Sequence, residues 1–268
     1  MTGATDISRL ASDEPLVEVA GITKYYGERR GCEDVSFDVY PGEVLAVVGE
    51  SGSGKSTLLN VLSTALEPTT GEVRYRLRDS TMRSLFAMSE AERRVLMRTD
   101  WGFVHQDPAQ GLRMSVSAGA NVGERLMAVG ERHYGRLRAA ATDWLARVEI
   151  AADRIDDAPR TFSGGMRQRL QIARNLVSGP RLVFMDEPTG GLDVSVQARL
   201  LDLLRTLVAD LGLSAVIVTH DLAVARLLSH RILVMRDGRV IESGLTDQVL
   251  DDPAASYTQL LVASVLQV

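Results

Sequence analysis

The chain has 268 residues, with 30 basic and 35 acidic side chains and a formal net charge of −5. This length suggests one large domain, or a core domain that carries a smaller insert. A mildly acidic chain does not provide the basic surface that a sequence-independent nucleic-acid binder needs, so we expect no nucleic-acid partner. The single cysteine, Cys32, forms neither an intrachain disulfide nor a cysteine-built metal site, which fits a reducing cytoplasm.

No apolar run approaches the roughly 18–20 residues that span a bilayer. The first residues also lack the apolar segment of a secretory signal. We therefore expect a cytoplasmic protein that does not insert into a membrane. Small and polar residues predict a flexible tail over residues 1–14, and the folded domain is expected to occupy residues 15–268.

The folded part begins with strand patterns and then changes texture. Val44–Val48 is a continuous apolar run, typical of a buried parallel strand, and Ser56–Leu66 has a helical pattern. Residues 77–160 are rich in Arg, Ala, Met and Leu, and they predict a mostly helical insert. The remaining predicted elements are strands at Leu16–Ala20, Val35–Val39, Leu182–Met185 and Ala215–Val218, helices at Ser89–Met97, Leu137–Val148 and Val194–Leu211, a hairpin over Ile232–Met235 and Val240–Glu242, and a helical tail from Asp247 to Val268.

The strongest chemical signal is the run Gly49-Glu50-Ser51-Gly52-Ser53-Gly54-Lys55-Ser56, which fits the P-loop pattern GxxxxGK[ST]. Its glycines let the backbone N–H groups face a phosphate, and the following helix adds its dipole. Lys55 is expected to reach the β- and γ-phosphates, Ser56 to ligate Mg²⁺, and Thr57 to join the phosphate site. A chance match is expected in roughly one chain in a hundred of this length. The predicted strand before the motif and the helix after it favour a nucleotide site.

Two adjacent carboxylates, Asp186 and Glu187, follow the predicted strand Leu182–Met185. The carboxyl ends of parallel strands face the ligand crevice of an α/β sheet. Alone, this pair would be interpreted as a loop with a capping role. Together with the P-loop, it predicts that Asp186 holds Mg²⁺ through water and that Glu187 polarises the attacking water.

A third signal is Ser163-Gly164-Gly165 at the start of a helical pattern. Exposed N–H groups at a helix start form an anion site, although Ser and Gly are also ordinary N-cap residues. The order of P-loop, Ser-Gly-Gly and acidic strand resembles the ATP-binding cassette (ABC) ATPase family. The resemblance implies an α/β P-loop NTPase fold with a mixed-sheet core, an N-terminal antiparallel β subdomain and a helical insert. It also implies ATP and Mg²⁺ as ligands.

The resemblance assigns roles to further residues. Tyr26 matches the adenine-stacking aromatic, with Tyr25 as an alternative, and Gln106 matches the glutamine that senses Mg²⁺. Asp193 matches the loop at the dimer seam, and His220 matches the switch histidine beside the γ-phosphate. Taken singly, Tyr26 and Gln106 are equally compatible with a surface aromatic and a loop amide, while Asp193 could be a helix N-cap and His220 a core histidine. In this order and spacing, chance is not expected to bring all four together.

The family mechanism implies a head-to-tail dimer with a second ABC ATPase subunit, either the same chain or a related one. Ser163–Gly165 of one subunit would then cap the ATP held by the P-loop of the other. Glu187 and His220 would orient the water while Lys55 stabilises the developing charge. Two departures from the family pattern are Met166, which ends the signature, and Gly190, which removes a hydroxyl from the seam loop.

Segments outside the nucleotide motifs resemble the ATP-binding subunit of the carbon–phosphorus lyase system, which breaks down phosphonates. The stretch from Arg98 to Gln106 and the stretch from Gly111 to Gly119 carry this resemblance in the insert. It implies docking on a soluble lyase core complex. Position alone suggests that Trp101, Arg113, Met114 and Gly119–Leu126 contribute to the docking surface.

An alternative is the ATP-binding subunit of an oligopeptide- or nickel-type ABC importer, which shares Met166 and the tail Pro253 to Leu260. A third hypothesis, an ABC ATPase tethered to nucleic acid, is disfavoured by the acidic charge and by the lack of a long coiled-coil pattern.

Overall fold

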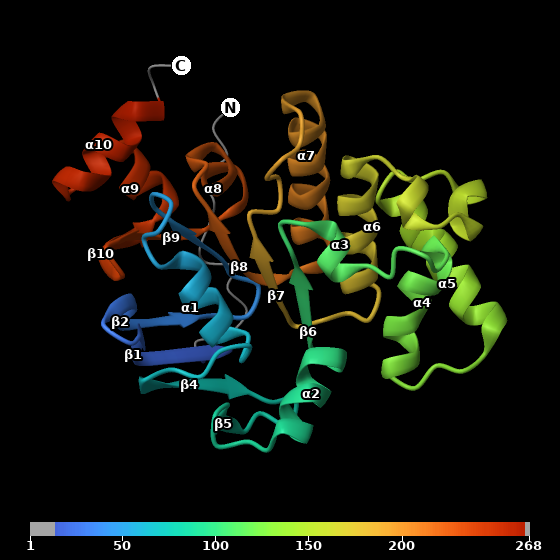
Figure 1. Cartoon of the computed structure of the whole chain (residues 1–268), viewed down its shortest axis with the longest axis horizontal. Helices are drawn as coiled ribbons and strands as arrows, with labels where there is room; N and C mark the ends of the chain where they lie inside the picture. Colours follow the sequence, from blue (N-terminus) through green and yellow to red (C-terminus); the bar gives the residue numbers. More distant parts are fainter. Residues whose placement is uncertain (1–13, 266–268) are drawn as a thin grey trace. The chain divides into compact units, whose positions relative to one another are not determined.

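The computed structural model describes residues 14–265, with side chains up to residue 264. Within this range the chain forms two compact units (Figure 1). Unit 1 combines the residues up to 93 with those from 208 onward, and unit 2 comprises residues 94–207. The predicted tail lies outside the described residues, except for Glu14.

Unit 1 holds an antiparallel sheet and strands of a mixed sheet. The antiparallel sheet has the order β2-β1-β4-β5. In the mixed sheet, β3 pairs in parallel with both β8 and β9, and β10 pairs antiparallel with β9. The elements of this unit are β1 (Val17–Tyr26), β2 (Arg29–Val39), β3 (Val44–Val48), α1 (Lys55–Leu62), β4 (Thr70–Arg76), β5 (Met82–Ser84), β8 (Ser214–Thr219), α8 (Leu222–Leu228), β9 (Arg231–Arg236), β10 (Arg239–Leu245), α9 (Thr246–Asp251) and α10 (Ser256–Val265).

All five residues of β3 are buried, because parallel strands flank it on both edges. This burial requires the continuous apolar run that the sequence shows. The predicted first strand ends at Ala20, whereas β1 continues to Tyr26. Gly21 has a φ of +59° and lies at an irregularity in the pairing, so β1 continues although the period-2 pattern is broken.

Unit 2 pairs two parallel strands and contains a group of helices. Helices α4, α5 and α6 pack together, with Val122, Leu145 and Leu170 among their buried side chains. The elements of this unit are β6 (Trp101–Val104), α3 (Pro108–Gly111), α4 (Ala118–Ala128), α5 (Tyr134–Arg147), the 3₁₀ turns η2 (Ala152–Asp156) and η3 (Pro159–Thr161), α6 (Gly164–Leu176) and β7 (Leu182–Asp186). Helices α2 (Glu90–Thr99) and α7 (Val194–Leu211) each include residues of both units.

The predicted helical insert over residues 77–160 differs from the structure at its start. This range includes β5 and β6, and β6 pairs with β7. These strands have only three and four residues, too short for a period to be recognised. The helical tail predicted from Asp247 is also divided into α9 and α10. Pro253, which lacks a backbone N–H, lies between them.

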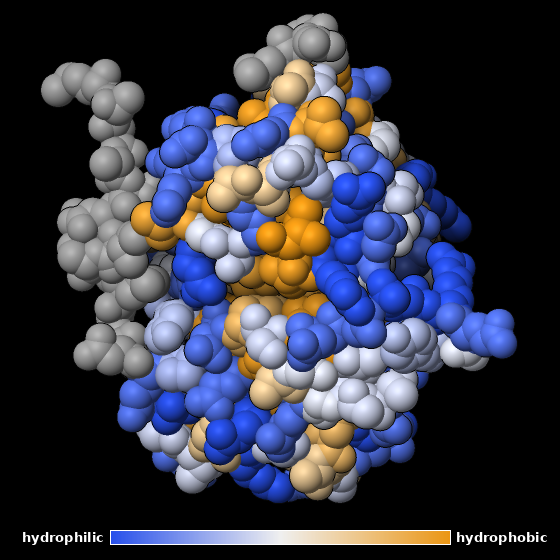
Figure 2. All heavy atoms as spheres, turned by 90° about the vertical axis from the view of Figure 1, so that its left-hand side faces the viewer, coloured by the Kyte–Doolittle hydropathy of each residue, from blue (hydrophilic) through white to orange (hydrophobic). Residues whose placement is uncertain are grey.

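One face of unit 1 carries hydrophobic side chains amid a hydrophilic surface (Figure 2). Strand β10 and helix α10 contribute partly exposed apolar residues, namely Ile241, Leu245 and Leu260. In the first turn of α10, Tyr257 belongs to a buried cluster that also includes Val48 and Val234. Within residues 14–265, no helix is both long enough and apolar enough to cross a membrane.

Candidate nucleotide-binding site

The P-loop follows β3 and leads into α1. Its glycines at positions 49, 52 and 54 have φ values of +146°, +84° and +103°, which L-residues with side chains rarely adopt. A Cβ atom on Gly49 would lie 2.2 Å from the carbonyl oxygen of Met235. On Gly54 it would lie 2.2 Å from the carbonyl oxygen of Gly31. Glycine therefore lets the loop pass close to two neighbouring backbone segments.

The side chain of Lys55 is buried and turns back into the P-loop. Its Nζ donates to the carbonyl oxygens of Gly49 and Glu50, at 2.7 and 2.8 Å. Ser56 is exposed in the first turn of α1, and no side chain caps this helix at Gly54. The ammonium group of Lys55 and the N-terminus of α1 thus lie at one loop, an arrangement that favours phosphate binding.

The structure distinguishes the two candidate tyrosines. The Tyr25 hydroxyl donates to Glu33 at 3.0 Å, and this side chain is half-buried. Tyr26 is 48% exposed. Gly31 separates Tyr26 from the P-loop helix, because a Cβ on it would lie within 3 Å of both the Tyr26 ring and the Thr57 methyl group. Tyr26 is therefore the better placed of the two for a base stacked beside the P-loop.

His220 comes directly after β8, whose last residue, Thr219, is paired with Val48 of β3. Gly49 and His220 thus follow the carboxyl ends of neighbouring parallel strands. This is the edge at which ligands bind in open α/β sheets. His220 is exposed, whereas the six residues of β8 are buried. Within unit 1, Tyr26 thus lies across Gly31 from the P-loop helix, and His220 follows the strand that pairs with the strand before the P-loop.

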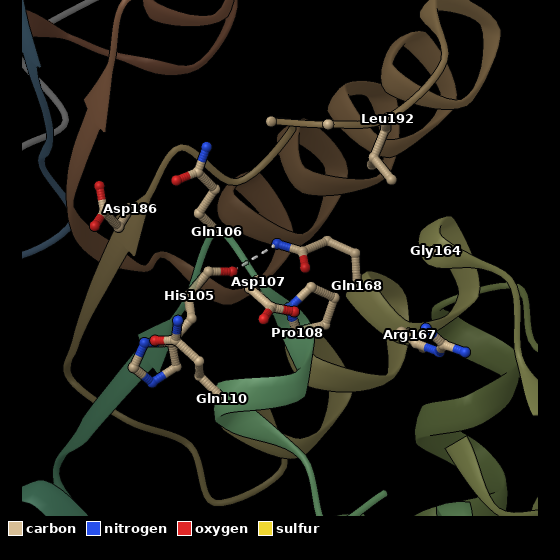
Figure 3. Close-up of a pocket in the computed structure, with 12 residues that line it drawn as sticks. His105, Gln106, Asp107, Pro108, Gln110, Gly164, Arg167, Gln168, Asp186 and Leu192 are labelled. Carbon is tan, nitrogen blue, oxygen red and sulfur yellow. Dashed lines mark hydrogen bonds between the residues drawn. The ribbon is translucent and has the colours of Figure 1, made fainter. Parts of the chain in front are cut away.

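Unit 2 repeats this arrangement with β6 and β7. Val104 pairs with Met185, so His105 directly follows β6 and Asp186 is the last residue of the adjacent parallel strand β7. Gln106 and Asp186 line one pocket of about 430 Å³. In Figure 3 these two side chains lie on one side of the pocket and Gly164 on the other. The predicted metal-sensing amide and acidic residue are thus brought to one cavity.

Three buried amides on α6 support this cavity, and the sequence analysis missed them. Gln171 accepts from the His105 N–H at 2.7 Å and donates to the His105 carbonyl oxygen at 3.1 Å. Gln168 donates to the carbonyl oxygens of His105 and Pro188. Asn175 accepts from Phe103 N–H at 3.0 Å. The available signal was their spacing of three and four residues, which places three polar side chains on one helix face.

Glu187 occupies a strained turn after β7. Its φ is +44°, a value uncommon for a residue with a side chain, and its carbonyl oxygen accepts from Gly190 N–H at 2.8 Å. Such backbone strain concentrates at functional sites. A Cβ on Gly190 would lie 3.0 Å from Nε2 of Gln106, so this glycine lets the turn approach the glutamine closely.

Ser163 is the N-cap of α6, and its Oγ accepts from Met166 N–H at 3.3 Å. Ser163 and Gly164 are exposed, while Gly165 is buried against Val196. The N-cap interpretation of Ser163 is therefore correct. Because the side chain and Gly164 also face solvent, they remain accessible to a ligand or a second subunit.

The predicted seam loop lies beside this helix start. A Cβ on Gly164 would contact a methyl group of Leu192 at 3.6 Å. The backbone carbonyl of Asp193 accepts from the N–H groups of Val196 and Gln197, which begins α7. Asp193 is exposed, so it takes part in the helix start through its main chain while its side chain faces solvent.

Two histidines beside the strands, His105 and His230, have pKa values below the ordinary value. Burial lowers the pKa of His105, and the nearby Arg174 lowers it further. Burial also lowers the pKa of His230, whose Nδ1 accepts from Val44 N–H at 2.9 Å.

No group of three or more His, Cys, Asp or Glu side chains in residues 14–265 could hold a metal. Of the predicted Mg²⁺ ligands, Gln106 and Asp186 of unit 2 bring an amide and a carboxylate to one pocket, and Ser56 of unit 1 has an exposed hydroxyl.

Comparisons with known proteins agree with this arrangement. The family model described as "ABC transporter" matches residues 32–190. The Escherichia coli (strain K12) protein named "Putative phosphonates utilization ATP-binding protein PhnK" is 66% identical over 255 residues, which cover 95% of this chain and 99% of that protein. The dipeptide transport ATP-binding protein DppF of Haemophilus influenzae is 35% identical over 267 residues, covering 96% of this chain and 80% of that protein.

Two solved structures have the same fold. The ATP-binding cassette MJ0796, as a dimer in a post-hydrolysis state with ADP and Pi, has a TM-score of 0.75 and 30% identity over 86% of this chain and 98% of its own. The protein cbiO1 of Clostridium perfringens, part of the ABC transporter complex cbiONQ, has a TM-score of 0.77 and 26% identity over 96% of this chain and 100% of its own. The chain therefore belongs to the ABC transporter family and is an ATP-hydrolysing ABC-type ATPase.

Proposed function

We propose that this ABC ATPase docks on a soluble carbon–phosphorus lyase core complex and drives or regulates phosphonate breakdown through dimer closure and opening. The observation that carries the proposal is the 66% identity to PhnK of Escherichia coli, which extends over 99% of that protein. Identity to the dipeptide transporter subunit of Haemophilus influenzae is 35%. Because the match to PhnK includes the insert, it covers the region in which ABC subfamilies differ.

The residues of both units have defined parts in the proposed ATP reaction. Tyr26 stacks on the base, while Lys55 and the P-loop N–H groups bind the phosphates. Glu187 and His220 orient the attacking water. Ser56, Gln106 and Asp186 would hold Mg²⁺, since this ion prefers oxygen ligands, and the ion would neutralise phosphate charge.

The second subunit has a proposed role at the signature. Ser163 and Gly164 are exposed at the start of α6, and Gly191 and Asp193 are exposed beside them. The cassette MJ0796 has been solved as a dimer. In the proposed head-to-tail dimer, these residues cap the ATP bound to the partner chain, so that closure excludes water from the reacting phosphate.

The docking surface can be narrowed from the structure. Trp101, which was expected to contribute, is only 3% exposed and packs edge-on against Phe184. Its indole ring belongs to the β6–β7 core, so Trp101 does not contribute to a docking surface. The aromatic was misassigned because the four-residue strand that buries it was not recognised.

Arg113 and Met114 remain candidates. The Arg113 side chain is 64% exposed. The loop that carries it is fixed by the buried Asn121, which accepts from Arg113 N–H and donates to three carbonyl oxygens of residues 113–117. Along α4, Ala120 is exposed while Val122 is buried. We therefore assign the docking surface to Arg113, Met114 and the exposed face of α4.

The test is affinity purification of the tagged chain from cells growing on phosphonate, with and without ATP. We expect the lyase core proteins in the soluble fraction. Ala120→Arg should reduce their recovery, whereas Ala139→Arg, the same change at an exposed position of α5, should not. Equal recovery with both variants would contradict this docking surface.

The alternative is an importer subunit, which the dipeptide transport relatives and the tail from Pro253 to Leu260 favour. An importer subunit should be recovered with membranes and a permease. Its recovery there, with no lyase protein bound, would replace the lyase proposal.

A further inference from the structure

The C-terminal part of unit 1 contacts the P-loop at two backbone groups. The hydroxyl oxygen of Tyr257 accepts from Glu50 N–H at 3.2 Å. The N–H of Gly238, in the turn between β9 and β10, donates to the carbonyl oxygen of Ser53 at 3.0 Å. The loop is therefore held on both sides of Ser51 and Gly52 by residues about 200 positions further along the chain.

Packing fixes the position of the Tyr257 ring. The side chain is 9% exposed and belongs to the buried cluster that includes Val48, the last residue before the P-loop. The guanidinium of Arg236 lies 4.9 Å from the ring centroid, which is within the range of a cation–π interaction. A buried tyrosine normally pairs its hydroxyl, and here the hydroxyl is directed to the loop.

Glu50 links this hydroxyl to the catalytic lysine. Its N–H donates to Tyr257, and its carbonyl oxygen accepts from Nζ of Lys55 at 2.8 Å. The orientation of Glu50 therefore determines where one acceptor of the ammonium lies. If Glu50 turned, the lysine would lose this acceptor and the loop would lose part of its curl.

We propose that Tyr257 is a positioning residue for ATP binding, which acts by holding Glu50 of the P-loop through its hydroxyl. The tail from Pro253 to Leu260 thus has a role in the ATPase itself, whichever protein the chain serves. The inference depends on the proposed role of the P-loop in binding ATP. It does not depend on a lyase or permease partner.

Tyr257→Phe tests the hydroxyl alone, because the ring and its packing are kept. One neutral hydrogen bond contributes about 0.5–1.5 kcal/mol. We therefore expect ATP to bind about three- to tenfold more weakly, with a raised KM, a kcat within about twofold of the native value, and a nucleotide-free Tm lowered by no more than about 2–4 °C, since the bond is also present without nucleotide. Tyr134→Phe, at a ring that is 72% exposed on α5, should leave ATP binding unchanged.

Binding is measured by titrating a fluorescent ATP analogue into the purified full-length chain, with Lys55→Ala as the reference for a disabled P-loop. If Lys55→Ala binds ATP normally, the proposed P-loop role fails. If Lys55→Ala loses binding while Tyr257→Phe binds like the native chain, the inference about Tyr257 fails alone. A fall in nucleotide-free Tm with unchanged KM would assign Tyr257 a purely structural role and overturn the proposal.

Arg236→Gln provides a second measurement, because it removes the charge over the ring without touching the P-loop. Weaker ATP binding with an unchanged Tm supports the positioning role. Native ATP binding by both Arg236→Gln and Tyr257→Phe contradicts it.

Discussion

The two units place residues at a sheet edge in the same way and support them differently. In unit 1, the paired residues Val48 and Thr219 precede the P-loop and His220. In unit 2, Val104 and Met185 precede Gln106 and the acidic pair. Parallel register thus brings two segments together in each unit, even though about 170 residues separate them in unit 1 and about 80 in unit 2.

The support in unit 1 is mostly main chain. Gly238 N–H donates to Ser53, its carbonyl oxygen accepts from Glu33 N–H, and glycines allow close backbone contact. In unit 2, the side chains of Gln168, Gln171 and Asn175 hold the end of β6. Close main-chain contacts require glycine at fixed positions, and these glycines can be recognised in the sequence as a motif. Buried amide side chains such as Gln171 have no such motif, because their role depends on burial in the folded chain.

The largest effect is expected for Glu187→Gln, which separates the chemical step from nucleotide binding. Glutamine keeps the shape of the side chain but cannot act as a base, so turnover should fall by about 10²–10⁴-fold. ATP binding, which we assign mainly to unit 1, should persist and should favour the dimer. Phosphate release, ATP titration and size-exclusion chromatography with ATP measure the three quantities.

Lys55→Ala is the complementary variant, since it should lose ATP binding as well as turnover. Brisk hydrolysis by Glu187→Gln would falsify the role of this carboxylate as the base. Loss of ATP binding by Glu187→Gln would contradict the division of tasks between the units.

The next effect is expected at Gly54, where the main-chain support can be tested against a matched glycine. Gly54 and Gly130 have φ values of +103° and +104°, so both become strained by alanine. Only Gly54 also meets a backbone oxygen, at 2.2 Å, whereas no described atom lies within 4 Å of a Cβ on Gly130. Gly54→Ala should therefore cost about 2–3 kcal/mol more unfolding free energy than Gly130→Ala, and ATP binding should weaken with it.

Urea denaturation of both variants measures this difference. If both variants lose the same unfolding free energy, the positive φ alone explains the requirement for glycine at Gly54. Close main-chain contact would then not be what supports the P-loop in unit 1.

The elements predicted from sequence follow from signals that are local. The apolar run Val44–Val48 is β3, and the helix predicted at Val194–Leu211 is α7. The P-loop, the ABC fold and the phosphonate-system relative were also recognised, and the family match confirms the fold. Local patterns are sufficient here because each segment carries its own period or its own glycines.

The features that were missed depend on distant partners. Strand β6 has four residues and is defined by pairing with β7, 81 positions later. Burial of Trp101 against Phe184 arises from the same pairing, and the amide contacts of Gln171 depend on the packing of α6 against β6. The Tyr257 contact joins residues 207 positions apart. No window along the sequence contains both partners of these contacts.

A smaller effect is expected for Gln171→Leu, which tests the amide support of unit 2. The change removes bonds to the N–H and the carbonyl oxygen of His105 and leaves both partly buried groups without this amide. We expect a loss of about 2–3 kcal/mol in unfolding free energy. Gln259→Leu, which removes one exposed bond to Pro253, should cost less than about 0.5 kcal/mol. Similar losses for the two variants in chemical denaturation would show that the buried amides are not a support.

The smallest effect concerns pH and compares the partly buried histidines of the two units, His230 and His105. Burial holds the pKa of His230 below 6.5, so the unfolded chain binds the proton first as the pH falls. The stability that His230 contributes is therefore present above pH 6.5 and is lost as the pH falls toward its lowered pKa. His230→Asn keeps an oxygen acceptor for Val44 N–H but does not titrate, so unfolding free energy measured from pH 8 to 5 should fall less steeply than in the native chain.

The remaining acid sensitivity would include that of His105 in unit 2, whose pKa is lowered by burial and by Arg174. An unchanged slope in His230→Asn would mean that unit 1 contributes nothing through this histidine and that the acid response arises from other groups.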